Sequence, residues 1–194
     1  MTSQDSEIHI ALPDWLSRLA ARHSVIESVE DRMAFVIEAS RANIRAGTGG
    51  PFAAAVFEAG SGRLVSLGVN LVSHANLSVL HAEVVAVTLA QLALRTSDLG
   101  GADLPRHELV VSTEPCAMCY GAILWSGITR LVCGARSGDA RGIGFDEGPE
   151  QTDWGAALKQ RGIEVVRDIQ RDDAAAVLEE YRRLGGRIYN SRGC

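Results

Sequence analysis

The sequence has little that would place it in a membrane, outside the cell or on nucleic acid. No uninterrupted apolar run approaches the roughly 20 residues of a membrane-spanning helix. The first ten residues, MTSQDSEIHI, lack the basic start and apolar core of a targeting segment. Lys and Arg number 19 against 24 acidic residues, and this balance argues against a large phosphate-binding surface. We expect a cytoplasmic protein with no membrane contact and with nucleic acid an unlikely partner.

Cysteine is also scarce, and the chain has no internal repeat or linker rich in Pro, Gly and Ser. In the expected cytoplasmic setting, metal ligands, catalytic groups or plain thiols are more typical of cysteines than disulfides are. A chain of 194 residues suffices for one globular domain. We expect an N-terminal extension over residues 1–28 and a single domain over residues 29–194. The four cysteines are Cys116, Cys119, Cys133 and Cys194.

The pattern of apolar residues predicts alternating helices and strands. Apolar residues at helical spacing predict a helix over 29–46, which ends at Gly47. Strands joined through helical crossovers imply parallel pairing in a layered α/β protein. A polar loop over 71–78 and a glycine-rich loop over 137–151 interrupt the pattern. The other predicted elements are a hairpin around 60–62, helices near 81–94, 119–127, 153–161 and 172–184, and strands near 108–112, 129–135 and 163–167.

The segment TEPCAMC sets two thiols, Cys116 and Cys119, three positions apart behind a proline. The pair could be a redox couple, half of a structural metal site or part of a catalytic one. Two cysteines do not complete a zinc site, and of the five histidines only His81 opens a helix with a carboxylate beside it, Glu83 in HAEV. One His and two Cys leave an open position on zinc, which is typical of catalytic centres. Cys133, inside an apolar strand, is the nearest rival ligand.

The combination of H-x-E at 81–83 and P-C-x-x-C at 115–119 resembles the zinc motifs of the cytidine deaminase superfamily. The resemblance covers roughly residues 29–185. It implies an α/β fold, the three-layer α/β/α cytidine deaminase-like fold, with a central mixed five-stranded sheet flanked by helices. It also implies one Zn2+ per chain and a homodimer.

The resemblance implies hydrolytic deamination, with His81, Cys116 and Cys119 as the zinc ligands. Zinc lowers the pKa of its bound water to about 7, which gives a hydroxide that attacks an amine-bearing ring carbon. Glu83 would shuttle the protons between the water, a ring nitrogen and the departing ammonia. Such acid-base catalysis contributes roughly a hundredfold to ten-thousandfold in rate.

Within the superfamily the chain is most similar to bacterial guanine deaminases, which implies conversion of guanine to xanthine plus ammonia. The similarity assigns Phe52, in GGPFAAAV, to an aromatic contact with the base, and Asn70 to reading a purine edge, since an amide both donates and accepts. Ala82, inside HAEV, belongs to the same substrate-contacting set. Trp125 would form a wall of the pocket. Asn70 could also merely end its strand, and Phe52 and Trp125 could instead be residues of the hydrophobic core.

The segment GFDEGP matches the place where guanine deaminases supply a second acid near the substrate amine. The similarity assigns Glu147 to assist ammonia departure, with Asp146 as the competing choice, and adds Phe145 to the substrate contacts. Tyr189, in GGRIYN, matches a C-terminal aromatic that related enzymes can insert from a partner subunit, although such a tyrosine is more often packing. The glycines of GFDEGP would also permit a mobile lid.

Other functions are also compatible with these zinc motifs. A tRNA adenosine deaminase would act on a flipped-out base; the acidic balance argues against it, as does Trp125, where tRNA enzymes typically have histidine. Cytosine, cytidine, guanosine or an aminotriazine such as ammeline could use the same zinc chemistry. A noncatalytic zinc-binding module belongs to a different class and leaves Glu83 unexplained.

Overall fold

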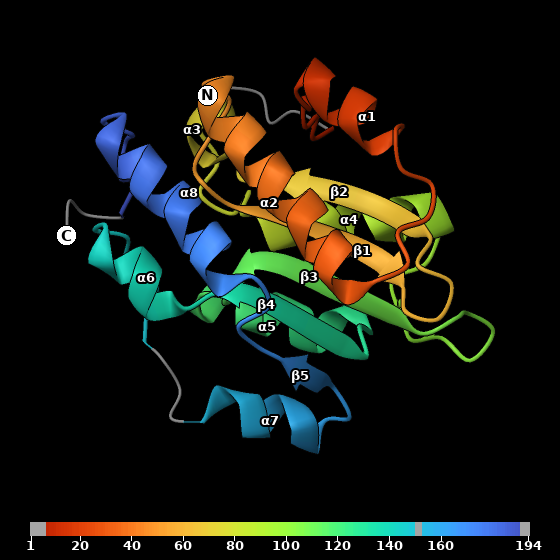
Figure 1. Cartoon of the computed structure of the whole chain (residues 1–194). Helices are drawn as coiled ribbons and strands as arrows, with labels where there is room; N and C mark the ends of the chain where they lie inside the picture. The colour runs from red at the N-terminus through yellow and green to blue at the C-terminus, as the bar shows by residue number, and fades with distance from the viewer. Residues whose placement is uncertain (1–6, 150–152, 191–194) are drawn as a thin grey trace, which may run out of the picture.

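A central sheet of five strands organises the chain in the computed structural model, which describes residues 7–149 and 153–190 (Figure 1). The strands are β1 (Ala53–Glu58), β2 (Leu64–Val69), β3 (His107–Thr113), β4 (Arg130–Ala135) and β5 (Glu164–Val166). Their order is β2-β1-β3-β4-β5. β1 pairs antiparallel with β2 and β3, whereas β4 pairs parallel with β3 and β5. The sheet is mixed, as predicted.

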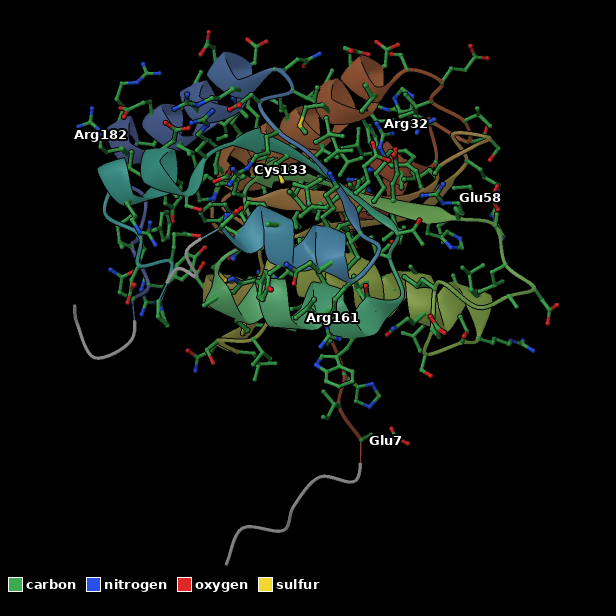
Figure 2. All side chains as sticks on the ribbon, turned by 90° about the horizontal axis from the view of Figure 1, so that it is seen from below. Glu7, Arg32, Glu58, Cys133, Arg161 and Arg182 are labelled. Carbon is green, nitrogen blue, oxygen red and sulfur yellow. The ribbon has the colours of Figure 1, made fainter. Side chains whose placement is uncertain are left out.

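Helices cover both faces of this sheet. They are α1 (Asp14–Ala20), α2 (Val29–Arg45), α3 (Val72–Ala75), α4 (Ala82–Leu94), α5 (Ala117–Ser126), α6 (Ser137–Gly142), α7 (Trp154–Gln160) and α8 (Arg171–Arg183). Successive strand residues point to opposite faces, so Val110 packs in a core with α2 and α8, while Val111 packs in a second core with α4, α5 and α7. Figure 2 shows Cys133 of β4 between the two helical layers. The predicted three-layer α/β/α fold is confirmed.

A buried group of charges ties α2 to the sheet. Arg32 donates to one carboxylate oxygen of Glu108 on β3, and Arg130 on β4 donates to the other oxygen at 2.8 Å. Glu108 is fully buried, and Arg32 also donates to the carbonyl oxygens of Ile26 and Glu27. Because removal of one partner leaves a buried charge unpaired, the group fixes the position of α2 on the sheet.

The described part of the predicted extension, residues 7–28, packs onto the domain. Leu16 and Leu19, on one side of α1, join the core beneath α2. The Ile26 amide donates to the Gly62 carbonyl, which joins the segment to the β1–β2 turn. The stretch before α2 therefore contributes to the same hydrophobic core as the rest of the chain.

Two short helices lie where the sequence predicted loops. The four residues of α3 lie in the polar loop, and the six residues of α6 lie in the glycine-rich loop. Contacts from distant residues hold α6, because the Ser137 amide donates to the Glu114 carboxylate at 3.0 Å. Its first turn also pairs Asp139 with the Arg136 amide at 2.8 Å. Across the described ranges, no helix has the length and apolarity to cross a membrane.

Candidate active site

The N-terminal ends of α4 and α5 bring the proposed zinc ligands together on one face of the sheet. His81 directly precedes α4, and Cys116 directly precedes α5, with Cys119 in the first turn of that helix. β3 ends at Thr113 and Pro115 leads into α5, in keeping with the preference of proline for helix starts. His81 Nδ1 lies 3.4 Å from Cys116 Sγ and 3.6 Å from Cys119 Sγ.

This spacing fits a tetrahedral zinc ion. With Zn–S near 2.3 Å and Zn–N near 2.05 Å, tetrahedral angles place N and S about 3.6 Å apart. The three ligand atoms all lie within 4.8 Å of one another, and within the described residues no other group of three or more such side chains does so. Cys133 is not in the group, because its side chain lies in the core between β3 and α5. Cys194 lies outside the described residues.

The thiol of Cys116 is prepared for metal binding by its neighbours Cys119 and His81. A hydrogen bond with the Cys119 thiol, followed by one with His81, lowers the pKa of Cys116 to about 4. The same thiol pairing, with burial, raises the pKa of Cys119 well above its usual range. Cys116 is therefore a thiolate at neutral pH, which is the form that binds metal.

A cavity of about 380 Å³ opens onto the metal-binding group, a volume within the usual range of small-molecule sites, roughly 300–1,000 Å³. It gathers most of the predicted site residues from six separate stretches of the chain. The predicted residues that line it are Phe52, Asn70, His81, Glu83, Cys116, Phe145, Asp146, Glu147 and Tyr189.

Two acids in this cavity can exchange protons near neutral pH. Glu83, in the first turn of α4, is 7% exposed, and burial followed by the Cys116 charge raises its pKa to about 7. Glu147 is 9% exposed, and the same two causes raise its pKa to about 8. Asp146 has its carboxylate engaged by the Gly148 amide at 2.8 Å. The geometry therefore favours Glu147 over Asp146 as the second acid.

Aromatic side chains form one wall of the cavity. The rings of Phe52 and Phe145 meet edge to face with centroids 5.0 Å apart, and the Tyr189 ring lies 5.0 Å from Phe145. The tail reaches the cavity of its own chain, so no partner subunit is needed to place Tyr189 there. A side chain at Gly50 would collide with the Tyr189 hydroxyl, since an added Cβ would lie 2.4 Å from it.

Asn190, which the sequence reasoning missed, anchors this tail. Its side-chain amide donates to the Gly144 carbonyl and its side-chain oxygen accepts from the Asp146 amide, both at 2.9 Å. Nothing in the local sequence marks it except its place beside Tyr189. The two bonds hold the tail against the GFDEGP segment.

Asn70 presents a free donor to the cavity. Its side-chain oxygen accepts from the Val72 amide at 3.2 Å, and its main-chain oxygen accepts from the Asn43 amide group at 2.9 Å. Its Nδ2 has no partner among the described residues, although Asn70 is only 1% exposed. A buried donor of this kind suits a polar ligand atom.

One predicted contact is corrected. Trp125 is 81% exposed, and it is not among the described residues that line the cavity. The prediction that Trp125 forms a wall of this cavity is therefore wrong for a single chain. Six helical residues separate it from Cys119, which turns it about 120° around α5. Ala82 is buried and packs its methyl group in the core with α5, and its assignment to the substrate contacts stays a prediction.

The fold and the site together define the class of zinc-dependent deaminases. The family model for the cytidine and deoxycytidylate deaminase zinc-binding region matches residues 26–135. The chain belongs to this family.

Similar proteins include guanine deaminases. The chain is 36% identical to guanine deaminase of Bacillus subtilis (strain 168) over 104 residues, which cover 54% of this chain and 62% of that relative, less than two thirds of its length. A solved guanine deaminase from Nitrosomonas europaea is 48% identical, with a TM-score of 0.89, covering 93% of this chain and 99% of the other. A solved mutant protein in complex with 8-azaguanine is 47% identical, with a TM-score of 0.90 and coverage of 94% and 99%.

Proposed function

We propose that the protein is a zinc-dependent guanine deaminase that hydrolyses guanine to xanthine and ammonia. One observation carries the proposal: a single cavity, lined by two buried acids of raised pKa and an aromatic wall, opens onto a His/Cys/Cys group with zinc spacing. The similarity to the Nitrosomonas europaea guanine deaminase along almost its whole length supports guanine as the ring.

In the proposed reaction, water oxygen bonds to C2 of guanine and the C2–N bond to the amine breaks. His81, Cys116 and Cys119 would hold a zinc ion, which would supply a Lewis acid that makes water nucleophilic near neutral pH. Glu83 removes a proton from water and delivers it to a ring nitrogen. Glu147 protonates the departing amine, and the second water proton, released as the new C2–O bond becomes a carbonyl, returns to Glu147. Burial and the neighbouring Cys116 charge raise the pKa of both acids, and such buried carboxyl groups are suited to general acid-base catalysis.

The base is proposed to lie against the aromatic wall. Phe52 and Phe145 contact its face, and Tyr189 closes the cavity over it. The free Nδ2 of Asn70 donates to an acceptor on the purine edge. Asp146 shapes the loop beside Glu147 through its bond to the Gly148 amide.

A homodimer is proposed through the exposed side of α5. Trp125 is 81% exposed, and Met118, at the cavity rim on the same helix, is 37% exposed. Large apolar side chains gathered on a surface are typical of interfaces. Sedimentation of the wild-type protein as a dimer, and of Trp125→Glu as a monomer, is expected; a monomeric wild type contradicts this proposal. The cytoplasmic location and the domain boundary at residue 29 stay predictions.

The proposal is tested by ammonia release from a panel of rings with zinc-loaded protein. The panel contains guanine, guanosine, cytosine, cytidine, adenine, ammeline and a tRNA anticodon stem-loop. We expect guanine to have the highest kcat/KM. Activity on the stem-loop with none on guanine would instead assign the protein to tRNA editing.

A further inference from the structure

One buried hydroxyl among the residues that line the cavity has no hydrogen-bond partner in the described residues. Thr113, the last residue of β3, lines the cavity and is 5% exposed. Its Oγ1 has no hydrogen-bond partner within residues 7–149 and 153–190. An unpaired buried hydroxyl costs free energy, so the protein carries a destabilising group at this position.

The side chain of Thr113 belongs to the metal-binding side of the sheet. Residues two apart on a strand share a face, and Leu109 and Val111 pack in the core formed with α4 and α5. These are the helices whose N-terminal ends carry the proposed zinc ligands. Thr113 therefore lies on the side of the sheet that carries the metal-binding group, in the lining of the same cavity.

The backbone around Thr113 is held on both sides. Before it, the Ser112 hydroxyl accepts from the Ala53 amide at 3.1 Å. After it, the Glu114 amide donates to the Ala135 carbonyl at 2.9 Å, and the Glu114 carboxylate is held by the Ser137 amide at 3.0 Å. The segment that carries the hydroxyl is thus held in place before any ligand binds, which lowers the entropic cost of binding there.

We propose that the Thr113 hydroxyl hydrogen-bonds the amine-bearing end of the substrate and is a specificity-determining residue. A hydroxyl both donates and accepts, so it can serve an amine and the ring nitrogen beside it. A site with a buried polar group rejects rings that leave this group unpaired. The inference rests on the proposed deaminase function and names one further residue of the same site.

The test compares Thr113→Val with Thr113→Ser in zinc-loaded protein. Valine has nearly the shape of threonine without the hydroxyl, whereas serine keeps it. We expect Thr113→Val to lower kcat/KM about tenfold to a hundredfold while the melting temperature stays equal or rises. Thr113→Ser should retain most of the activity. A merely structural hydroxyl would instead lower the melting temperature on removal.

Ser40 provides a matched control. It is fully buried in α2, its hydroxyl also has no partner among the described residues, and it is not among the residues found to line the cavity. Ser40→Ala should keep or raise the melting temperature with kcat/KM unchanged. Each variant is assayed on the ring that the wild type deaminates fastest.

The outcomes separate the two proposals. A wild-type protein that deaminates no ring in the panel overturns the proposed function, and this inference with it. An active wild type overturns the inference alone when Thr113→Val keeps kcat/KM within about twofold, or when its melting temperature falls together with its activity.

Discussion

Replacement of Glu83 by glutamine removes a proton carrier while keeping the shape of the side chain. Glu83 lies in the first turn of α4, two residues after His81, and is 7% exposed in the cavity. It is not one of the three grouped ligand residues, so Glu83→Gln should still bind zinc. The neutral amide also has no charge to bury, and the melting temperature should not fall.

The expected loss of activity follows from the role of this carboxyl group. General acid-base catalysis contributes about a hundredfold to ten-thousandfold, which corresponds to roughly 2.7–5.5 kcal/mol of activation free energy. Ammonia release from guanine should therefore fall by at least about a hundredfold. Zinc per chain and the melting temperature are measured on the same sample.

Glu38→Gln is the control for this experiment, because Glu38 is an exposed acid on α2 outside the cavity lining. It should leave kcat and KM unchanged. If Glu83→Gln binds one zinc and turns over guanine at a rate close to wild type, the acid-base assignment is refuted.

Three further variants test the zinc ligands, the contact of Asn70 with the substrate and the packing of α1. Cys116→Ala removes one of three grouped ligands and should lower bound zinc below one per chain by metal analysis; a full equivalent would contradict the ligand set. Asn70→Ala removes the free donor and should lower kcat/KM for guanine by about fivefold to a hundredfold, and an unchanged value would exclude the contact. Leu16→Ala should cost about 2–5 kcal/mol in urea unfolding, whereas a cost near zero would show that α1 adds nothing to the core.

The metal site could be predicted from the sequence because H-x-E and P-C-x-x-C resemble the motifs of zinc deaminases, and the ligands also lie at helix starts. His81 and Cys116 each stand directly before a helix, and Pro115 signals the second start. These positions depend on turn chemistry within a few residues. Cys119 follows Cys116 by about one helical turn. The three ligand side chains could therefore be assigned to helix starts without knowledge of how the helices pack.

Contacts that depend on the packing of whole elements could not be predicted in this way. Trp125 lies on α5 as expected, but the rotation of the helix about its axis turns the ring to the surface. The path of the tail to Tyr189 depends on Asn190, whose partners lie more than 40 residues away in sequence. The helix α6 was not predicted for the same reason. It is held by the carboxylate of Glu114, which lies outside residues 137–142, so the local pattern does not reveal it.

The most direct measurement of the central claim is xanthine formation from guanine during a titration of metal-free protein with zinc. The account predicts no turnover without zinc, a linear rise in activity as zinc is added, and a plateau at one zinc per chain, because one group of three ligands holds the metal. Xanthine formation that is independent of zinc, or its absence at one bound zinc per chain, would contradict the account.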